Sequence, residues 1–516
     1  MRFKTRTFQQ TAFLLMAILA GTLVAVAQEC PLRITLLQVN DVYQFSPVDR
    51  GTRGGIGRVL TLKKQIQKDS PNTLFLFSGD TISPSVESIT YKGSQMIEAW
   101  NVAGLDYATF GNHEFDFGPE VLQERIKESR FGWIAANVID KKTSEPFGGV
   151  PSYVIREFDG VKIGIIGLVL PETKITSRPG ADVDFLDPCE TANKLIPEMH
   201  AKGAQVIVAL THLSMREDKE VARCSDVDVI IGGHEHTLLE SAAGGAPIFK
   251  MTADARELGR IDLNISKSSG KLESIDWQVI PVTAETKEDQ GFARVYAKYA
   301  TLLGDLGQVI GRTLVVLDAR SAENRRGETN VGNLITDAFR KAMRADVAIM
   351  NGGSIRADSL ISAGRLTKRD LLSIIPFKNK VVKLELTGAA LRTMLEHGVA
   401  RSAEDSEPGR FPQVSGMRFT FDAARPAGSR VLAVTVNGVP LEDQKKYSLA
   451  TTNFLAEGGD GYEMLKSARL LVMPAQGPSD YDAIRQTFAA RSISPKVDGR
   501  IKRLDNAPNE KPSCPN

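Results

Sequence analysis

The 516-residue sequence has few cysteines, an even balance of charge and a single long hydrophobic run. Its four cysteines form no CxxC pair, which argues against a zinc site built from thiolates. Lys and Arg number 64 and Asp and Glu number 62, so charge gives no reason to expect binding to a nucleic-acid polymer. No repeat relates the two halves. The length exceeds the ~250–300 residues at which one hydrophobic core stops growing, so we expect two domains.

The hydrophobic run lies near the N-terminus, where Arg2, Lys4 and Arg6 precede the apolar residues 11–27. The run ends in Ala-Val-Ala, which is typical of a cleavage site, so we predict a signal peptide at residues 1–27 and a periplasmic or secreted mature protein. A retained membrane anchor is the alternative. Loss of three basic residues would change the net charge from +2 to −1. Because no second long apolar run exists, we expect no membrane span in the mature chain.

Export changes what the cysteines predict, since disulfides persist in an oxidising compartment. We predict the pair Cys189–Cys224 first and the pair Cys30–Cys514, between the chain ends, second. The sequence alone does not decide this connectivity.

Short apolar strands alternate with amphipathic helical patterns from residue 32 to about 282, which predicts a layered α/β domain. The predicted strands are Ile34–Val39, Thr73–Phe77, Tyr107–Phe110, Trp133–Asn137, Val161–Leu168, Gln205–Leu210 and Val227–Ile231, followed by antiparallel segments at Gly259–Ile265 and Leu272–Ile280. The predicted helices include Ile56–Lys68, Gln95–Asn101 and Thr191–Lys202. We place this domain at residues 30–284, a connecting helix at 285–311, a second α/β domain at 312–505 and a polar tail at 506–516.

Polar side chains follow several of these strands, where neighbouring strand ends can bring them together at one sheet edge. The residues in these positions are Asp41, Asp80, Asn112, His113, Asp116, His212, His234 and His236. They include four of the six histidines, whereas His200 and His397 lie in helical patterns. On an extended backbone His234 and His236 would point to the same side, with Glu235 opposite. Mixed oxygen and imidazole ligands without thiolate suit two divalent ions, such as Zn, Mn or Fe, in a hydrolytic site.

The order of the motifs is the most specific signal in the sequence. NDVY, GD, GNHEFD, THL and GGHEH resemble the motifs of the calcineurin-like metallophosphoesterases. RRGETNVGNLITDA, MNGGSIRAD, IIPFKNKVVKLELTG and NFLAEGGDGYEML resemble the C-terminal domain of the secreted bacterial 5'-nucleotidases. This resemblance covers residues 30–505. It implies an N-terminal four-layer αββα metallophosphoesterase domain, a connecting helix and a C-terminal α/β nucleotide-binding domain.

The resemblance also implies a role for each matching residue. Asp41 and His236 would hold one ion, Asn112, His212 and His234 would hold the other, and Asp80 would bridge the two. His113 and Asp116 would form a catalytic dyad. The nucleotide would be bound by Arg325, Asn351, Arg356, Phe377, Asn379, Phe454 and Asp460. In this set Phe377 and Phe454 would sandwich the base, and Asp460 would accept a hydrogen bond from the ribose.

Two residues depart from the family's pattern. The usual first motif is Asp-x-His, and Tyr43 stands in place of that histidine. Ser354 replaces the third glycine of the stretch before Arg356. Tyr43 leaves two interpretations open: its phenol oxygen coordinates the first ion, or it lies beside the ligands, which we favour at this point.

Together these features predict a phosphohydrolase that acts on nucleoside 5'-monophosphates. Nucleoside di- or triphosphates, nucleotide sugars and 2',3'-cyclic nucleotides are further expected substrates. We expect a monomer or weak dimer whose domains rotate about the connecting helix. One alternative is a sulfur-ester hydrolase of the thiosulfohydrolase type, against which the stacking pair Phe377 and Phe454 argues. The other is a catalytically silent nucleotide-binding or adhesion protein, against which the near-complete ligand set argues.

Overall fold

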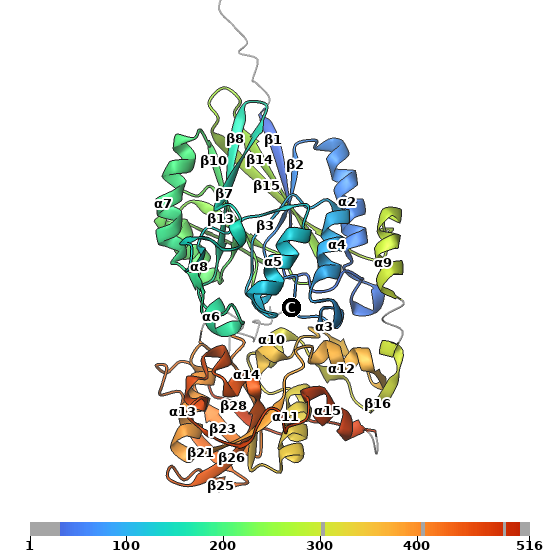
Figure 1. The fold of residues 1–516 in the computed structure, drawn as a ribbon, viewed down its shortest axis with the longest axis vertical. Helices are drawn as coiled ribbons and strands as arrows, with labels where there is room; N and C mark the ends of the chain where they lie inside the picture. Colours follow the sequence, from blue (N-terminus) through green and yellow to red (C-terminus); the bar gives the residue numbers. More distant parts are fainter. Residues whose placement is uncertain (1–30, 301–304, 404–407, 489–491, 506–516) are drawn as a thin grey trace, which may run out of the picture.

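A computed structural model describes residues 31–300, 305–403, 408–488 and 492–505, which fold into two α/β domains placed end to end (Figure 1). The predicted signal peptide, the proposed Cys30–Cys514 pair and the tail lie outside these residues. Within the described part of the chain, no helix is both long and apolar enough to cross a membrane.

The N-terminal domain contains two six-stranded sheets that pack face to face. The first has the order β15 (Leu272–Pro281), β14 (Glu257–Ile265), β1 (Leu32–Val39), β2 (Thr73–Phe77), β3 (Tyr107–Ala108), β4 (Gly132–Trp133). The second has the order β12 (Leu239–Ala243), β13 (Ala246–Lys250), β11 (Val229–Gly232), β10 (Val206–His212), β8 (Val161–Val169), β7 (Tyr153–Phe158). A small third sheet pairs β6 (Glu145–Pro146), β5 (Val138–Asp140) and β9 (Val183–Phe185).

The central strands are largely apolar along their length, because their side chains point alternately to the two faces of a sheet and both faces are covered. In β2, Leu74 and Leu76 join the core between the two sheets, whereas Phe75 and Phe77 join the core under the helices. Successive strand residues point to opposite faces, so a strand covered on both sides must be apolar throughout. Burying side chains of this size contributes about 1.5–3 kcal/mol each. The continuous runs in the sequence therefore predicted sheets covered on both faces.

Helices cover the outer face of each sheet, which completes the predicted αββα layers. Figure 1 shows α2 and α4 on one side and α7 and α8 on the other. The helices of this domain are α2 (Ile56–Asp69), α3 (Ser88–Tyr91), α4 (Ser94–Ala103), α5 (Pro119–Glu128), α6 (Thr173–Thr176), α7 (Pro188–Ala201), α8 (Met215–Cys224) and α9 (Ala293–Ala300). A capping box begins α8, where Ser214 and Glu217 satisfy each other's backbone N–H groups.

Most predicted bounds agree with the structure to within three residues, and three elements differ in ways that affect the site or the domain connection. Strands β3 and β4 are two residues long. After β3 the chain leaves the sheet to form the loop that carries Asn112 and His113, and after β4 it continues to β5 of the small third sheet. The connecting helix was predicted too long. Among the described residues of segment 285–311, helical structure covers residues 290–300 and a 3-10 turn at 305–307, and β16 begins at Val309 and pairs with β20. Residues 301–304 lie outside the description.

The C-terminal domain is built around a five-stranded and a four-stranded sheet. The first has the order β22 (Pro412–Ser415), β18 (Val347–Asn351), β26 (Lys446–Thr452), β21 (Val381–Thr387), β27 (Arg469–Val472). The second has the order β25 (Val439–Pro440), β24 (Val431–Val436), β23 (Met417–Phe421), β28 (Ile501–Arg503). Two short pairs join β16 (Val309–Thr313) to β20 (Gly364–Thr367) and β17 (Leu317–Asp318) to β19 (Leu360–Ile361).

Helices pack on the five-stranded sheet and form two cores with it. They are α10 (Ser321–Asn324), α11 (Asn330–Met343), α12 (Lys368–Ile374), α13 (Gly388–Val399), α14 (Asn453–Ala456) and α15 (Asp480–Phe488). In one core α11 packs with α15, and in the other α13 packs with the four-stranded sheet. The segments that follow β18 and β26 contribute Gly353, Ser354 and Phe454 to a cleft shared with the N-terminal domain.

Candidate active site

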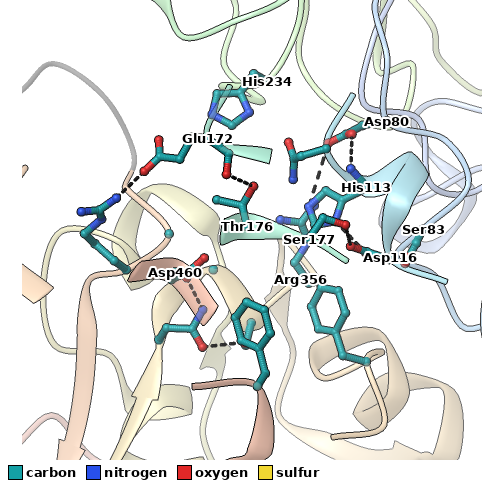
Figure 2. A pocket seen from close by; sticks show the side chains of 18 of the residues that line it. Asp80, Ser83, His113, Asp116, Glu172, Thr176, Ser177, His234, Arg356 and Asp460 are labelled. Atoms are coloured by element: carbon teal, nitrogen blue, oxygen red, sulfur yellow. Dashed lines mark hydrogen bonds and ion pairs between the residues drawn. The ribbon is translucent and has the colours of Figure 1, made fainter. Parts of the chain in front are cut away.

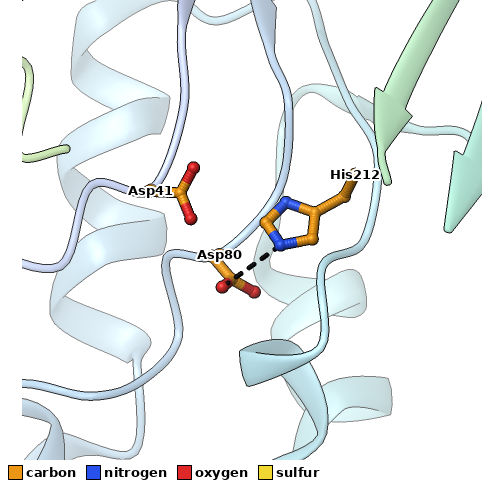
Figure 3. Close-up of side chains that lie close together, drawn as sticks. All are labelled: Asp41, Asp80 and His212. Carbon is orange, nitrogen blue, oxygen red and sulfur yellow. Dashed lines mark ion pairs between the residues drawn. The ribbon is translucent and has the colours of Figure 1, made fainter. Parts of the chain in front are cut away.

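The strand ends of the N-terminal domain converge on a buried group of carboxylates and imidazoles. Asp41 follows β1, Asp80 follows β2 and His212 ends β10. One donor atom from each of these three residues lies within 4.8 Å of the others, and all three side chains are buried (Figure 3). Segments far apart in the sequence thus meet at one sheet edge, as strand-end residues do in open α/β sheets.

The backbone at this edge is unusual for residues that are not glycine. The φ angles are 52° at Asp41, 70° at Asp80, 89° at His234 and 59° at His236. Such conformations cost of order 1–3 kcal/mol each and gather at functional sites. The expectation of an extended HxH segment was therefore wrong. The two imidazoles leave the loop after β11 in a left-handed turn, whose His234 N–H donates to Asp41 Oδ2 at 2.9 Å.

Charges within the group perturb one another strongly. Although burial opposes the charged form, Asp80 raises the pKa of His212 to about 10, and Asp80 Oδ2 lies 3.3 Å from His212 Nε2. Burial likewise opposes ionisation of Asp80 and Asp41, but nearby His212 and His236 hold the pKa of these carboxyls below its usual range. Perturbed groups of this kind mark functional sites.

The residues present fit divalent ions. Within the described residues, Asn112 Oδ1 is buried and makes no hydrogen bond, while His212 Nε2 faces the Asp80 carboxylate at 3.3 Å. Leaving an atom such as Asn112 Oδ1 unpaired costs about 1–3 kcal/mol unless something else binds it. The donors are carboxylate oxygens, an amide oxygen and imidazole nitrogens, which suit Zn, Mn or Fe.

Beside this group His113 and Asp116 form a hydrogen-bonded pair (Figure 2). His113 Nδ1 lies 2.7 Å from Asp116 Oδ2, and Ser177 Oγ donates to Asp116 Oδ1 at 2.7 Å. His113 Nε2 is 3.9 Å from Asp80 Oδ2. The carboxylate thus orients the ring so that its second nitrogen faces the strand-end group. Sequence reasoning did not find Ser177.

A single cleft joins the two domains over this group. It is lined by Asp80, Asn112, His113, Asp116, His234 and His236 from the first domain and by Arg325, Asn351, Arg356, Phe377, Asn379, Phe454 and Asp460 from the second. Asp41 and His212 lie directly behind this wall and are fully buried. The structure therefore brings together all of the predicted site residues.

The second domain holds its polar groups in a fixed chain. Asn351 Nδ2 donates to Asp460 Oδ2 at 2.5 Å, and Ser354 Oγ donates to Asn351 Oδ1 at 2.6 Å. The two bonds orient the Asn351 amide, because only its nitrogen donates and only its oxygen accepts. Phe377 stacks at 28° on His113 of the other domain, with ring centroids 6.0 Å apart.

Charged groups that sequence reasoning missed close one end of the cleft. Glu172, at the start of α6, accepts a hydrogen bond from Arg401 Nη1 at 2.7 Å and pairs with Arg410 Nη2. Both arginines belong to the second domain, so this ion pair fastens the domains together. No motif indicated it.

A buried cation behind the histidines was also missed. Lys250 Nζ contacts Asp218 Oδ2 at 2.7 Å and Glu235 Oε2 at 2.5 Å, and it donates to the carbonyl oxygens of Leu213 and Gly233 at 2.7 and 2.9 Å. These carbonyls adjoin His212 and His234 in the chain, so one ammonium group supports both histidine segments.

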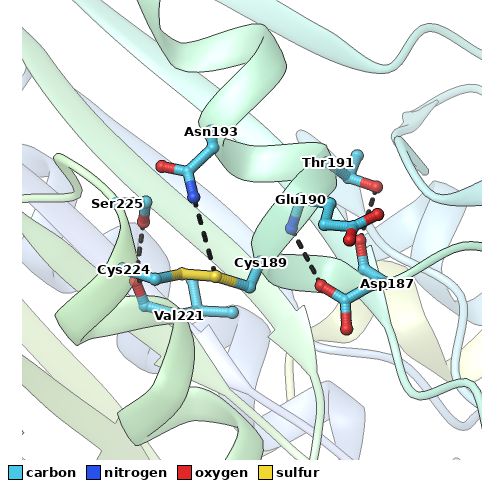
Figure 4. Close-up of a disulfide and its surroundings, with 8 residues drawn as sticks. All are labelled: Asp187, Cys189, Glu190, Thr191, Asn193, Val221, Cys224 and Ser225. Carbon is cyan, nitrogen blue, oxygen red and sulfur yellow. Dashed lines mark hydrogen bonds between the residues drawn. A yellow bond between two sulfur atoms is a disulfide. The ribbon is translucent and has the colours of Figure 1, made fainter.

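The predicted disulfide Cys189–Cys224 is confirmed. It joins α7 to α8 on the outer face of the second sheet, and its Cα atoms are 6.2 Å apart (Figure 4). The bond joins residues 35 positions apart in the sequence, and neither cysteine lines the cleft. Its contribution is to stability, about 2–4 kcal/mol for a typical disulfide.

Comparison with known proteins agrees with this geometry. The family described as calcineurin-like phosphoesterase matches residues 34–238, and the family described as 5'-nucleotidase, C-terminal domain matches residues 309–467. The snake venom 5'-nucleotidase of Gloydius brevicauda is 31% identical over 495 residues, covering 84% of this chain and 82% of that protein. The trifunctional nucleotide phosphoesterase protein YfkN of Bacillus subtilis is 30% identical and covers 91% of this chain, which spans 35% of that protein.

Solved structures give the same result. The 5'-nucleotidase precursor of Thermus thermophilus has a TM-score of 0.85 at 31% identity, covering 92% of this chain and 100% of that one. A sulfate thiohydrolase, SoxB, shares the fold with a TM-score of 0.79 at 20% identity. The chain belongs to the 5'-nucleotidase family, and its two domains are the calcineurin-like phosphoesterase and 5'-nucleotidase C-terminal domains of that family.

Proposed function

We propose that this protein hydrolyses the phosphate ester of nucleoside 5'-monophosphates in the cleft between its domains. One observation carries the proposal: a single cleft is lined by the strand-end ligands and dyad of one domain and by the aromatic and Asn351–Asp460 groups of the other. A phosphate placed at the first set would leave its nucleoside facing the second. Nucleoside di- or triphosphates, nucleotide sugars and 2',3'-cyclic nucleotides are further proposed substrates.

The ions would be held by two overlapping sets of residues. Asp41 and His236 would bind the first, Asn112, His212 and His234 would bind the second, and Asp80 would bridge them. Two ions held in this way would supply Lewis-acid stabilisation of the phosphoryl oxygens and a water activated for attack.

The dyad of His113 and Asp116 would stabilise negative charge that develops on the substrate. With Nδ1 held by Asp116, His113 would direct Nε2 at the reacting phosphoryl group and its leaving oxygen, where a donated hydrogen bond stabilises developing negative charge. Ser177 supports the orientation, because its hydroxyl donates to the carboxylate oxygen that does not contact the imidazole. Removing either partner would leave the ring free to turn.

The C-terminal domain would select the nucleotide. Arg356 Nη2 is buried and makes no hydrogen bond with any described residue, so the guanidinium has a donor available for a phosphate oxygen. Phe377 and Phe454 line the cleft and are only partly buried, which leaves aromatic surface for a base. Asp460 would accept from a ribose hydroxyl while Asn351 holds its other side.

We also propose that the protein works outside the cytoplasm, as a monomer or weak dimer. A disulfide between two helices suits an oxidising compartment. The apolar segment at residues 11–27 and the venom relatives support the same view.

The test is phosphate release from AMP, UDP-glucose, 2',3'-cyclic AMP and a small aryl phosphate, each with Mn²⁺, Zn²⁺, Mg²⁺ or Ca²⁺. We expect AMP hydrolysis that EDTA abolishes and a divalent ion restores. Full activity in metal-free protein would refute the two-ion site. Hydrolysis of a thiosulfonate ester but not of AMP would establish the sulfur-ester alternative. Nucleotide binding without turnover of any substrate would establish the catalytically silent alternative.

A further inference from the structure

The phenol oxygen of Tyr43 lies among the candidate ligands of the first ion. Tyr43 Oη is 3.2 Å from Asp41 Oδ1, 3.2 Å from Asp80 Oδ2 and 2.8 Å from His236 Nε2. His236 Nε2 is itself 3.2 Å from Asp41 Oδ1. Four donors arranged tetrahedrally at bond lengths of about 2.0–2.2 Å lie roughly 3.3–3.6 Å from one another. The three contacts of 3.2 Å are within a few tenths of an ångström of that spacing, and the 2.8 Å contact between Tyr43 and His236 is about 0.5 Å shorter than its lower end.

Packing holds the phenol in this place. Tyr43 is 5% exposed, and its backbone N–H donates to the buried Asp254 at 3.0 Å. The rings of His113 and His236 lie 5.9 and 5.5 Å from its ring centroid. Arg356, from the other domain, places its guanidinium 4.9 Å from the same centroid. A cation over the ring favours a phenol whose oxygen carries negative charge.

Hydrogen bonding alone accounts poorly for these contacts. A phenol has one proton to donate, and it can accept from His236 in addition. Both Asp41 and Asp80 are acceptors and lie at the same distance, so the one phenol proton is either shared weakly between the two contacts or absent from one of them. Two such oxygens in a buried site repel each other unless a cation lies between them.

We propose that Tyr43 supplies the phenol oxygen that completes the ligand set of the first ion, alongside Asp41, Asp80 and His236. The proposal rests on the two-ion site of the proposed function. In this ligand set the phenol oxygen of Tyr43 takes the place of the imidazole in the family's Asp-x-His motif. Three oxygens and one nitrogen form a harder set than two oxygens and two nitrogens, so the first site should favour Mn²⁺ or iron over Zn²⁺ more than an Asp-x-His relative does.

The test compares metal binding by wild type, Tyr43→Phe and Tyr43→His. Each protein is stripped of metal, and Mn²⁺ and Zn²⁺ are titrated separately by calorimetry with metal analysis of the product. We expect Tyr43→Phe to weaken Mn²⁺ at one site by more than about 100-fold, beyond the roughly 10–100-fold that an outer hydrogen-bond partner costs. Tyr43→His should restore binding and shift the preference toward Zn²⁺.

A spectroscopic arm separates coordination from hydrogen bonding. Loading Fe³⁺ should give wild type a visible phenolate-to-iron charge-transfer band that Tyr43→Phe lacks. The matched control is Tyr296→Phe, which removes a partly buried phenol that donates to a backbone carbonyl of the same domain; it should keep the band. Near-ultraviolet circular dichroism shows that each variant is folded.

These experiments distinguish failure of the Tyr43 proposal from failure of the proposed function. Equal affinity and stoichiometry in wild type and Tyr43→Phe would overturn the proposal, and so would an iron-loaded wild type without the band. A wild type that binds no divalent ion would instead refute the proposed function.

Discussion

Lys250 allows the sharpest test of how the histidine segments are supported. It is buried with two carboxylates, and although burial opposes its charge, Asp218 and Glu235 raise the pKa of its ammonium group, so it is a cation. Lys250→Met would leave both carboxylates buried without a positive partner. Removing one member of a buried ion pair costs about 3–5 kcal/mol. Each carboxylate would keep one hydrogen bond that partly stabilises its charge: Thr211 Oγ1 donates to Asp218, and the Met215 N–H donates to Glu235.

The assay is thermal and urea unfolding followed by tryptophan fluorescence. All three tryptophans, Trp100, Trp133 and Trp277, lie in the N-terminal domain, so the signal reports that domain alone. A loss of 3–5 kcal/mol corresponds to a fall in melting temperature of roughly 6–20 °C for a domain of this size. The measurement is made in EDTA, so that bound ions do not contribute.

The matched control is Lys202→Met, which removes an ammonium group paired with Glu198 on the surface of the same domain. This side chain is 56% exposed, so its loss should leave the unfolding midpoint within measurement error. If Lys250→Met melts within about 2 °C of the control, a shift that corresponds to well under the expected loss, the buried cation does not support the histidine segments and the reasoning fails. A second readout is metal affinity, which should fall roughly 10–100-fold because the carbonyls of Leu213 and Gly233 lose their donor.

The other predictions concern the cleft and the disulfide. His113→Ala should lower kcat on AMP roughly 10²–10⁴-fold with little change in KM, and an unchanged kcat would remove it from the dyad. Phe454→Ala should raise KM for AMP roughly 5–150-fold but not for a small aryl phosphate; equal effects would argue against stacking. Ser354→Gly frees the Asn351 amide to turn, so KM for AMP should rise about 5-fold while aryl phosphate turnover stays constant. Replacing both cysteines of the Cys189–Cys224 bond by serine should lower the free energy of unfolding by about 2–4 kcal/mol without changing kcat, and unchanged stability would contradict this.

Much of the fold was predictable because its signals are local. The run from Ile34 to Val39 is apolar on both faces, and only a strand covered on both sides buries every residue of such a run. Helix α2 was predicted to within one residue of its observed end, Asp69. The connecting helix was not, because β16 forms only when β20 is present to accept its backbone hydrogen bonds.

The candidate site was predictable as a set of residues but not as a geometry. The HxH turn at His234 depends on a hydrogen bond from its N–H to Asp41, 193 residues away in the chain. Glu172, Arg401 and Arg410 meet only because the two domains close on each other. No periodicity or spacing in the sequence predicts such long-range contacts.

What the sequence by itself determined is the chemistry available at each strand end and the order in which the two domains follow. Those properties depend on residue identity and on short-range backbone preference. Only the tertiary structure decided which donor atoms share one space, and Tyr43 shows why. Its phenol oxygen is a candidate ligand only because it lies beside three donor atoms from the loops that follow β1, β2 and β11. The packing of the sheets sets the distances between these atoms.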